Sequence, residues 1–394
     1  MLHSINATFQ TLESRANSMF TWEMQLTRRE LFISGAASLA TFALPLRSDA
    51  ATLRTLKNGI DISWLPDVEA AGGVFYSDTG RKMDAIALMK YYGIKVGRLR
   101  VFVNPSTLNG NLDRAIALAK RLKAQGIEVC VDLHYSDDWA DPGLQQAPAA
   151  WPSKIGDLEE QVINYTTETL NRFLSAGVSP QWVQIGNEIS NGFLWPLGHI
   201  SSGSSQEWEN FVTLYNAGAY ALRETLPKAK SVLHLDCGGD PNRVRNWYAT
   251  AKEHGLSDFD VFGLSYYCQW QGSLSDLETT LNVVSTELKK PVLIAETAYP
   301  WTPQKFGNDV INTSAAHLDG FPQSPDGQRD YVLRLASSLR SLPKNLGVGI
   351  WWWEGLAIQV KSASASDLWN GGMANSTLVD TTGKALPALK ALRG

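Results

Sequence analysis

Residues 181–190, Gln-Trp-Val-Gln-Ile-Gly-Asn-Glu-Ile-Ser, hold a short apolar run that stops at an amide followed by an acid. Val183 and Ile185 are β-branched and follow a tryptophan, which favours a buried strand. Glu188 comes just beyond the end of that strand. Residues at the carboxyl ends of parallel barrel strands are where barrel enzymes hold their reactive groups. We therefore expect Glu188 to carry chemistry.

A second strand-like run ends in the same way. Residues 291–300, Pro-Val-Leu-Ile-Ala-Glu-Thr-Ala-Tyr-Pro, place four apolar residues directly before Glu296. Tyr299 and Trp301 follow closely and supply aromatic side chains. Two acids at two strand ends predict a paired-carboxylate site on the rim of a barrel.

Composition limits the classes of protein to be considered. The 394 residues are 44% hydrophobic and 19% charged, so the chain can bury a large core and lacks the composition of a disordered protein. Its 35 Lys and Arg against 39 Asp and Glu leave a net charge of −4, without a basic run. Neither nucleic acid nor an anionic membrane is therefore an expected partner. The 14 Trp offer flat apolar faces for stacking on sugar rings or for core packing.

The first 50 residues have the pattern of an export signal. Residues 27–33, Thr-Arg-Arg-Glu-Leu-Phe-Ile, open a mild apolar run over 31–46 that ends at Ser-Asp-Ala, residues 48–50. The run is too short to span a membrane, and the small residues suit cleavage near Ala50. We expect a twin-arginine signal, hence a bacterial chain that is periplasmic or secreted and free of the membrane after cleavage. An amphipathic N-terminal helix of the fold is the alternative.

The cysteine pattern does not indicate disulfides. Cys130, Cys237 and Cys268 are odd in number, widely spaced and adjacent to apolar strand-like runs, and no C-x-x-C pair is present. We expect three buried free thiols. Free thiols agree with folding in a reducing cytoplasm before export.

After the leader, strand-like and helix-like runs alternate to the end of the chain. A parallel strand needs a crossover connection to the next, so eight such repeats predict a single α/β domain over 51–394 with the (β/α)8 TIM-barrel fold. The predicted strands are 59–64, 95–103, 127–133, 183–186, 232–235, 260–266, 292–295 and 348–353, and the predicted helices are 82–92, 112–125, 158–176, 208–225, 244–254, 274–288, 328–342 and 386–392.

A doubly wound sheet is the alternative architecture. It would require a glycine-rich nucleotide-binding turn after the first strand, where this chain has Leu-Pro-Asp at 65–67. No G-x-G-x-x-G or Walker sequence occurs anywhere in the chain. The barrel is therefore favoured.

The residues at the strand ends match the needs of glycoside hydrolysis: two Glu lie there with Arg, His, Tyr and Trp, and the His are not clustered as in a metal site. Glu188 with a raised pKa would protonate the leaving oxygen, and Glu296, kept ionised by Arg100, would be the nucleophile. Asn187 would bind a sugar 2-hydroxyl, and Tyr266 would donate a hydrogen bond to Glu296. The predicted catalytic residues are Glu188 and Glu296, and the predicted substrate-binding residues are Arg100, His134, Asp138, Trp139, Asn187, Tyr266, Tyr267 and Trp353.

Several longer motifs make the resemblance to one family specific. Among them are RLRVFVNP (98–105), HYSDDWADPG (134–143), QIGNE (184–188) and ETAYP (296–300), together with GIDISWLP, PAAW, GFLWP and SYY. The whole mature chain resembles the endo-β-1,4-galactanases of glycoside hydrolase family 53. The resemblance implies a retaining clan A barrel that cleaves β-1,4-galactosidic bonds in galactan or type I arabinogalactan, with Glu188 as acid/base and Glu296 as nucleophile.

Two departures from the family pattern bear on specificity. Residues 265–272 read SYYCQWQG where the family has SYYPxWHG, and residues 351–354 read WWWE in place of FYWE. Some bacterial relatives bind calcium in the loop after the seventh strand. Here residues 302–312 offer a single acid, Asp309, which is few for an oxygen cage, so we expect no cofactor, with a calcium ion in this loop as the alternative.

Two other functions fit the same barrel. One is a clan A endoglycanase acting on xylan, mannan or β-glucan, and the other is a sugar-binding barrel without catalysis. The presence of both Glu188 and Glu296 argues against the second. In each case the expected partner is a polysaccharide and the expected assembly is a monomer.

Overall fold

The computed structural model describes residues 55–307, 309–311, 320–364 and 369–393. Residues Thr52–Gly394 form one compact unit. The predicted export signal in residues 1–50 lies outside the described residues.

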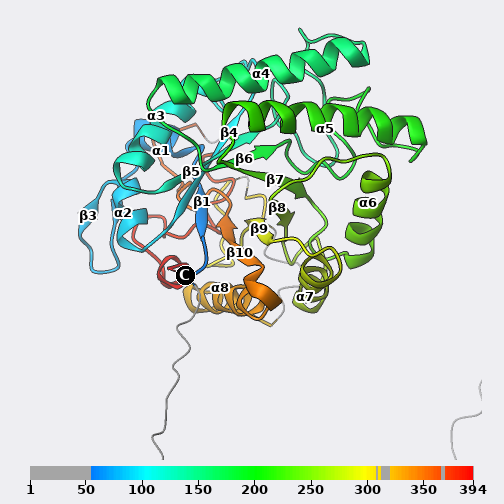
Figure 1. Ribbon diagram of the computed structural model, residues 1–394. Coiled ribbons are helices and arrows are strands. Elements are labelled where there is room, and N and C mark those ends of the chain that lie inside the picture. Colours follow the sequence, from blue (N-terminus) through cyan, green and yellow to red (C-terminus); the bar gives the residue numbers. More distant parts are fainter. Residues whose placement is uncertain (1–54, 308, 312–319, 365–368, 394) are drawn as a thin grey trace, which may run out of the picture. The chain divides into compact units, whose positions relative to one another are not determined.

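Eight parallel strands close into a barrel, which confirms the predicted (β/α)8 fold (Figure 1). The barrel strands are β1 (Gly59–Asp61), β4 (Val96–Val101), β5 (Glu128–Leu133), β6 (Trp182–Ile185), β7 (Lys230–Leu235), β8 (Val261–Ser265), β9 (Val292–Thr297) and β10 (Gly347–Trp352). Their order around the barrel is β1-β10-β9-β8-β7-β6-β5-β4, and β4 pairs with β1 to close it. All eight carboxyl ends therefore meet at one rim.

Helices connect the strands and lie around the outside of the barrel (Figure 1). They are α1 (Leu65–Ala70), α2 (Ala85–Tyr91), α3 (Leu112–Ala124), α4 (Ile155–Ser175), α5 (Ser205–Thr225), α6 (Pro241–Glu253), α7 (Leu274–Asn282), α8 (Pro325–Arg340) and α9 (Pro387–Ala391). Local chemistry explains several of their starts. Asn111 and Ser204 accept backbone N–H bonds at the starts of α3 and α5, and Ser273 with Asp276 forms a capping box at α7.

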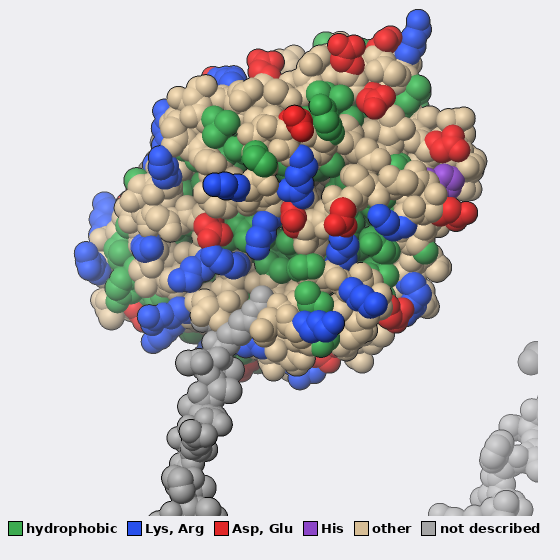
Figure 2. Space-filling model, in the orientation of Figure 1, with side chains coloured by type: hydrophobic (Ala, Val, Ile, Leu, Met, Phe, Trp, Pro, Cys, Tyr) green, Lys and Arg blue, Asp and Glu red, His purple; other side chains and the backbone are tan. Residues whose placement is uncertain are grey.

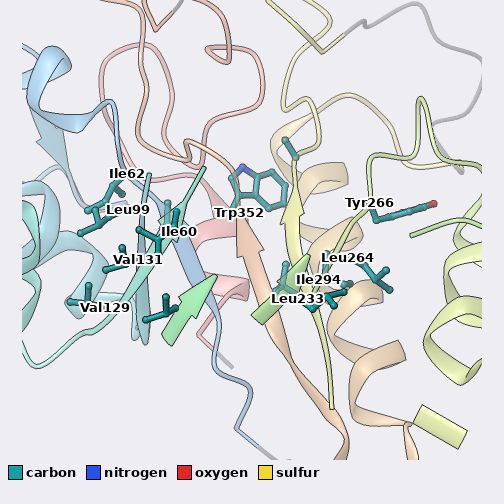
Figure 3. Close-up of a cluster of buried hydrophobic side chains, with 14 of the residues drawn as sticks. Ile60, Ile62, Leu99, Val129, Val131, Leu233, Leu264, Tyr266, Ile294 and Trp352 are labelled. Atoms are coloured by element: carbon teal, nitrogen blue, oxygen red, sulfur yellow. The ribbon is translucent and has the colours of Figure 1, made fainter. Parts of the chain in front are cut away.

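Side chains of each strand alternate between the barrel interior and the helices. In β4, Leu99 and Val101 belong to the large core between strands and helices, part of which Figure 3 shows. Val96 belongs instead to a smaller apolar cluster inside the barrel. Because side chains alternate with a period of two, Arg98 and Arg100 also point inward, above Val96. The interior is thus apolar at one end and polar at the rim where the strands end.

Three local differences from the predicted elements have clear causes. Residues Lys82–Met83, expected to open a helix, form a short strand that pairs with Phe75–Tyr76, and α2 begins only after its N-cap Asp84. Helix α1 was not predicted, although Pro66 in its first turn is a favourable start. Helix α7 gives way to a π-helical turn at Val283–Glu287.

The surface and the cysteines agree with the sequence. Figure 2 shows Lys and Arg side chains interspersed with Asp and Glu on the face that it presents. Cys130, Cys237 and Cys268 are buried free thiols, as predicted. Within the part of the chain that the structure describes, no helix is long and apolar enough to cross a membrane.

Candidate active site

A cleft of about 700 Å³ opens at the rim where the strands end. Eight of the ten predicted site residues line it: Glu188, Glu296, Arg100, His134, Trp139, Asn187, Tyr267 and Trp353. Asp236, Trp270, Gln271 and Arg98, which were not among the predicted residues, line it as well. The structure therefore brings most of the predicted residues into one place.

A bulge in β9 turns Glu296 into the barrel. Ala295 belongs to the apolar cluster inside the barrel, so strict alternation would point Glu296 outward. The register between β8 and β9 shifts after Leu264, and inward-facing Ser265 pairs with Glu296. Thr297 then faces outward, where its hydroxyl contacts that of Tyr331 in α8 at 3.1 Å. Bulges of this kind re-aim side chains next to active sites.

Glu188 stands on a strained turn after β6. Its φ angle is 50°, in the left-handed region that residues other than glycine rarely adopt. Such a conformation costs on the order of 1 kcal/mol and persists only where the surroundings hold it. The Gln145 amide supports this turn by donating to the carbonyl oxygen of Asn187 at 2.7 Å.

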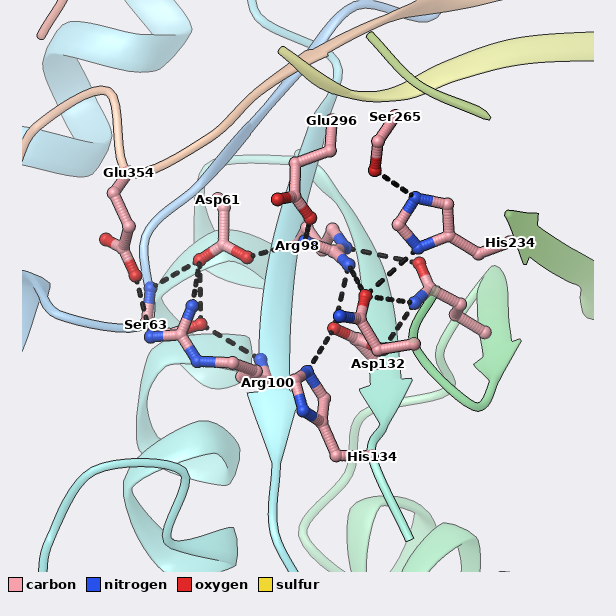
Figure 4. A network of polar contacts seen from close by, with 12 residues as sticks. Asp61, Ser63, Arg98, Arg100, Asp132, His134, His234, Ser265, Glu296 and Glu354 are labelled. Atoms are coloured by element: carbon pink, nitrogen blue, oxygen red, sulfur yellow. Dashed lines mark hydrogen bonds and ion pairs between the residues drawn. The ribbon is translucent and has the colours of Figure 1, made fainter. Parts of the chain in front are cut away.

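Arg98 is the centre of a buried polar network at the floor of the cleft (Figure 4). Its guanidinium lies 3.1 Å from Asp61, 2.9 Å from Asp132 and 3.1 Å from Glu296. It also donates to Asn187 at 2.8 Å and to Gln184 at 3.2 Å. The Nε, Nη1 and Nη2 atoms of this planar cation thus each have a partner, and these contacts fix the Glu296 carboxylate in position.

The predicted pairing of Arg100 with Glu296 is wrong. Arg100 is two residues further along β4 and nearer the rim, where it donates to Glu354 at 2.9 Å. Its guanidinium lies 4.4 Å from the Trp139 ring centroid and 5.3 Å from that of Trp64. Arg100 therefore braces the aromatic wall of the cleft by cation–π contact, and Arg98 holds Glu296.

Tyr267 takes the role that was expected of its neighbour Tyr266. Tyr267 donates a 2.8 Å hydrogen bond to Glu296 Oε1 and lines the cleft. Tyr266 is fully buried in the outer core (Figure 3), and its hydroxyl donates to the Gly272 carbonyl oxygen at 3.1 Å. Because neighbouring residues at a strand end face opposite ways, only Tyr267 can reach the cleft, and the assignment of Tyr266 to substrate binding is corrected.

The two carboxyl groups of the cleft sit in different electrostatic surroundings. Burial, with the Glu296 and Asp236 carboxylates nearby, raises the pKa of Glu188 well above its ordinary value. Burial also raises the pKa of Glu296, but the Arg98 cation and the Tyr267 hydroxyl oppose that rise. Within the described part of the chain Glu188 forms no ion pair, and its Oε1 contacts the hydroxyl of Ser265. Glu188 therefore retains a proton more readily than Glu296 does.

Aromatic and imidazole rings form one wall of the cleft. Trp139 and Trp353 lie 6.4 Å apart, and Trp64 packs behind both, at 5.8 Å and 5.4 Å. His134 Nδ1 accepts the backbone N–H of Ala140 at 3.2 Å, so its Nε2 carries the proton and donates to Asp132 at 3.0 Å. Burial lowers the pKa of His134, which keeps this imidazole neutral. The wall combines apolar faces with a fixed polar edge, as sugar binding requires.

Asp138 lies outside the catalytic cleft. It is exposed and lines a neighbouring hollow together with Asp67, Asn109 and the far side of Trp139. Asp138 occupies the variable position of the HYSDxWADP pattern, between Asp137 and Trp139. Its assignment to substrate binding beside the two Glu is not supported by its position.

Several buried polar residues at the strand ends were given no catalytic or substrate-binding role in the sequence interpretation. They share inward-facing positions near the strand ends, and they are Asp61, Arg98, Asp132, Gln184, His234 and Ser265. Applying the period of two outward from Arg100 and Glu188 would have found most of them. Asp236 and Trp270 lie beyond the strands, where alternation gives no guidance.

Among the described residues of the loop over 302–312, the one acid, Asp309, is occupied by backbone N–H groups. Asp309 accepts backbone N–H groups of Phe306 and, at 3.2 Å, of Asn375, so its carboxylate ties two loops together. Across residues 55–307, 309–311, 320–364 and 369–393, no group of three or more His, Cys, Asp or Glu could hold a metal ion. Asn312, at the end of the loop, lies outside the described residues.

Comparisons with known proteins place the chain among glycoside hydrolases. The model of glycosyl hydrolase family 53 matches residues 57–392. An arabinogalactan endo-β-1,4-galactanase of Thermothelomyces thermophilus is 35% identical over 342 residues, which cover 84% of this chain and 97% of that protein.

Solved structures give the same result. The GH53 catalytic domain of Ignisphaera aggregans has a TM-score of 0.79 and 33% identity, and the match covers 86% of this chain and 96% of that one. A fungal β-1,4-galactanase structure has a TM-score of 0.75 and 32% identity, covering 86% and 99% of the two chains.

Proposed function

The chain belongs to glycosyl hydrolase family 53, and on this premise we propose that it is an endo-acting, retaining β-1,4-galactanase that cleaves galactan and type I arabinogalactan. Relatives that carry the name arabinogalactan endo-β-1,4-galactanase are 34–35% identical over most of both chains. The site supports the assignment through its two carboxyl groups and its aromatic wall.

The observation that carries the proposal is the unequal surroundings of Glu188 and Glu296 in one cleft. Glu296 is paired with Arg98 at 3.1 Å and with Tyr267 at 2.8 Å, as a carboxylate nucleophile requires. Glu188 forms no ion pair with any residue that the structure describes, and burial raises its pKa, as a general acid requires. Glycosidases divide the acid and nucleophile roles between two carboxyl groups in this way.

In the first step, Glu296 would attack the anomeric carbon while Glu188 gives its proton to the departing glycosidic oxygen. The C–O bond to the leaving sugar breaks, and a glycosyl ester on Glu296 forms. In the second step, Glu188, now a carboxylate, would take a proton from water, and the water oxygen displaces Glu296. The sugar leaves with its original anomeric configuration and Glu188 is again protonated.

The walls of the cleft would hold the sugar chain. Trp353 and Trp139 offer apolar faces for sugar rings, and Trp270, which is 54% exposed and packs against Tyr267 with ring centroids 5.1 Å apart, lines the same cleft. Asn187 uses its Oδ1 for Arg98 and its Nδ2 for the Ala140 carbonyl at 2.9 Å. The second Nδ2 proton can donate to a sugar hydroxyl, which fits the expected contact with the 2-hydroxyl.

Release of reducing sugar from a panel of polysaccharides tests the proposal. We expect the purified protein to degrade potato galactan far faster than xylan, mannan or carboxymethylcellulose. Preference for one of the other three would identify another clan A endoglycanase. Binding of galactan without hydrolysis would leave only a sugar-binding barrel.

We further propose that residues 1–50 are a twin-arginine export signal that is removed near Ala50. The support is the Arg28-Arg29 pair, the short apolar run after it and the small residues at 48–50. The family match begins at residue 57, which is compatible with a leader that lies outside the catalytic domain.

A further inference from the structure

Glu188 is the end of a chain of side-chain hydrogen bonds that runs through three buried residues. The Ser265 hydroxyl donates to Glu188 Oε1 when Glu188 is ionised, and it can accept from Glu188 when that carboxyl group is protonated. His234 Nε2 lies 2.9 Å from the Ser265 hydroxyl, and His234 Nδ1 lies 3.0 Å from Asn187 Oδ1. His234 and Ser265 have no exposed surface, and their hydrogen-bond partners are neighbouring side chains. The direction of each hydrogen bond is therefore set by the residues themselves.

The Asn187 amide fixes the start of the chain. Its Oδ1 lies 2.8 Å from Arg98 Nη2, which can only donate, and its Nδ2 lies 2.9 Å from the Ala140 carbonyl, which can only accept. The Asn187 Oδ1 is therefore an oxygen that accepts. Gln184 Nε2 also lies 3.1 Å from this oxygen, but its two protons have Asp132 Oδ1 at 2.6 Å and the Gly186 carbonyl oxygen at 3.1 Å as acceptors. The two lone pairs of Asn187 Oδ1 therefore serve Arg98 Nη2 and His234 Nδ1, so His234 Nδ1 carries a proton and donates a hydrogen bond to Asn187.

His234 is neutral in this setting, because burial and the nearby Arg98 lower its pKa well below its ordinary value. With its proton on Nδ1, a neutral imidazole leaves Nε2 as an acceptor. Among the described residues, the group in contact with Nε2 that can donate to it is the Ser265 hydroxyl. Ser265 has a single proton, so when it donates to His234 its oxygen can only accept from Glu188.

We propose that the chain from Asn187 through His234 to Ser265 presents a hydrogen-bond acceptor to Glu188 and thereby holds Glu188 in its protonated form before glycosidic bond cleavage. Glu188 donates to Ser265, Ser265 donates to His234, and His234 donates to Asn187. His234 and Ser265 are positioning residues that act through Glu188. The inference deepens the proposed function, because it presumes that Glu188 is the acid of that reaction.

The chain also responds to the loss of the Glu188 proton. Once Glu188 has given its proton to the leaving sugar, the Ser265 hydroxyl can turn and donate to the new carboxylate, which leaves His234 Nε2 without a donor. An unsatisfied buried acceptor is unfavourable. The hydrogen bonds from Asn187 to Ser265 therefore favour the protonated form of Glu188 again when Glu188 later takes a proton from water. The same device therefore favours the acid form at the start of each turnover.

Other charges also act on Glu188 and set the background for any test. Glu296 after the bulge of β9, Asp236 beyond β7, Arg98 on β4 and the Tyr267 hydroxyl beyond β8 all face it. His234 itself faces Arg98, Asp132 and His134. A useful variant must therefore change the acceptor at His234 Nε2 and leave these charges in place.

The pair His234→Asn and His234→Gln isolates that acceptor. The Asn amide can replace the Nδ1 donor to Asn187 but has nothing at the Nε2 position, whereas the Gln amide oxygen can occupy that position and accept from Ser265. In His234→Asn, Ser265 is free to donate to ionised Glu188. The basic limb is the pH range in which kcat/KM on galactan falls because Glu188 loses its proton. We expect this limb to move to lower pH by about one unit, which is the size of shift that one hydrogen bond produces. At pH values above the limb, kcat/KM should therefore be about tenfold lower.

Three comparisons make the result specific. His234→Gln should restore a basic limb close to that of the unaltered protein, and His254→Asn, a change at the end of α6 outside the cleft, should not change it. An aryl galactoside with a good leaving group needs no protonation, so its hydrolysis by His234→Asn should be affected little and shows that the variant is folded. An unshifted or raised basic limb in His234→Asn, or equal limbs in both His234 variants, would overturn the proposal.

A measurement on the unaltered protein avoids the question of folding. In protein labelled with ¹⁵N-histidine, the His234 resonances, assigned with His234→Gln, should show a proton on Nδ1 and none on Nε2 at the pH of maximal activity. The Nε2 resonance should shift at the pH of the basic limb. A proton on Nε2 would overturn the proposal. Failure of the unaltered protein to cleave galactan would instead refute the proposed function and is seen in the same assays.

Discussion

Tyr267 and Glu296 are joined by a 2.8 Å hydrogen bond between the ends of the neighbouring strands β8 and β9. The Tyr267 hydroxyl binds Oε1 of Glu296, and Arg98 binds Oε2 at 3.1 Å. Each oxygen of the carboxylate thus has one donor. Both donors favour the ionised form that a nucleophile needs, and together they aim the carboxylate into the cleft.

Tyr267→Phe and Tyr266→Phe should therefore behave as opposites. The first removes a donor to a charged group, which contributes about 1.5–3 kcal/mol, so we expect kcat on galactan to fall roughly 10- to 100-fold. The second removes the bond to the Gly272 carbonyl outside the cleft, with a cost of about 1 kcal/mol in unfolding free energy and little change in kcat. Steady-state kinetics and urea unfolding of both variants check this, and a larger kinetic loss in Tyr266→Phe would contradict the placement of the two rings.

Arg98→Lys should disable the nucleophile more than it disables binding. Lysine cannot reproduce five donors in one plane, so Asp61, Asp132 and Glu296 lose part of their compensation. Because Arg98 lowers the pKa of Glu296, its weakening should raise that pKa and move the acid limb of the pH–rate profile to higher pH. Unfolding free energy should fall by up to about 3–5 kcal/mol, the cost of breaking a buried ion pair.

Arg114→Lys is the matched control for this prediction. Arg114 pairs with Asp67 at 2.9 Å in a part-exposed position outside the catalytic cleft. Exposed pairs contribute about 0–1 kcal/mol, so the acid limb and the stability should change little. An acid limb that does not move in Arg98→Lys would show that Glu296 does not depend on Arg98.

The barrel and its two carboxyl groups could be predicted from the sequence because both depend on local patterns. Alternating strand-like and helix-like runs determine the (β/α)8 topology, and Glu188 lies beyond its strand in the chain itself. The capping residue Asn111 likewise lies directly before its helix. Such features need only the neighbouring residues to be recognised.

Side-chain direction could not be predicted where geometry departs from strict alternation. The bulge in β9, opposite Leu264 and Ser265, decides that Glu296 points inward, and it depends on pairing between two strands. The choice between Arg98 and Arg100 depends on depth in the barrel, because both face inward. Only the three-dimensional register separates a residue that meets Glu296 from one that meets Glu354.

Glu188→Gln should stabilise the protein at neutral pH and not at low pH. Burial raises the pKa of Glu188, so between its unfolded and folded pKa values the folded state binds a proton that the unfolded state has lost. Stability from this group is therefore present below pH 4.5 and declines as pH rises. The neutral Gln has no such decline, so the Tm difference between variant and unaltered protein should grow from pH 4.5 to pH 8. A constant difference would mean that Glu188 ionises freely.

Replacement of Arg28-Arg29 by Lys-Lys should retain the full-length precursor in the cytoplasm. The export receptor reads the arginine pair as an address, and lysine keeps the charge without the guanidinium. Cell fractionation and immunoblotting of a bacterial host would show the precursor inside and no mature chain outside. Replacing the lone Arg15 of the leader by Lys is the matched control and should not slow export. Normal export of the Lys-Lys variant would indicate a different route.

Azide should distinguish the roles of Glu188 and Glu296 in a double displacement, which needs carboxyl groups about 5–5.5 Å apart. In Glu188→Ala, an aryl galactoside with a good leaving group needs no acid, so the glycosyl ester on Glu296 still forms, and azide should intercept it as the β-galactosyl azide. In Glu296→Ala no ester can form, so azide attacks directly from the open side and should give the α-azide.

Both variants should lose most of their activity on galactan, because acid–base help alone contributes roughly 10²- to 10⁴-fold. Azide should raise the rate of Glu188→Ala only where hydrolysis of the ester limits turnover, which a burst of released phenol would show. NMR of the azide products gives their anomeric configuration directly. The reverse pattern would exchange the two roles, and since Arg98 and Tyr267 both bind Glu296, it would also mean that these donors serve the acid. An inverted sugar from the unaltered protein would exclude the double displacement, because each of its two steps inverts the anomeric carbon and together they restore the original configuration.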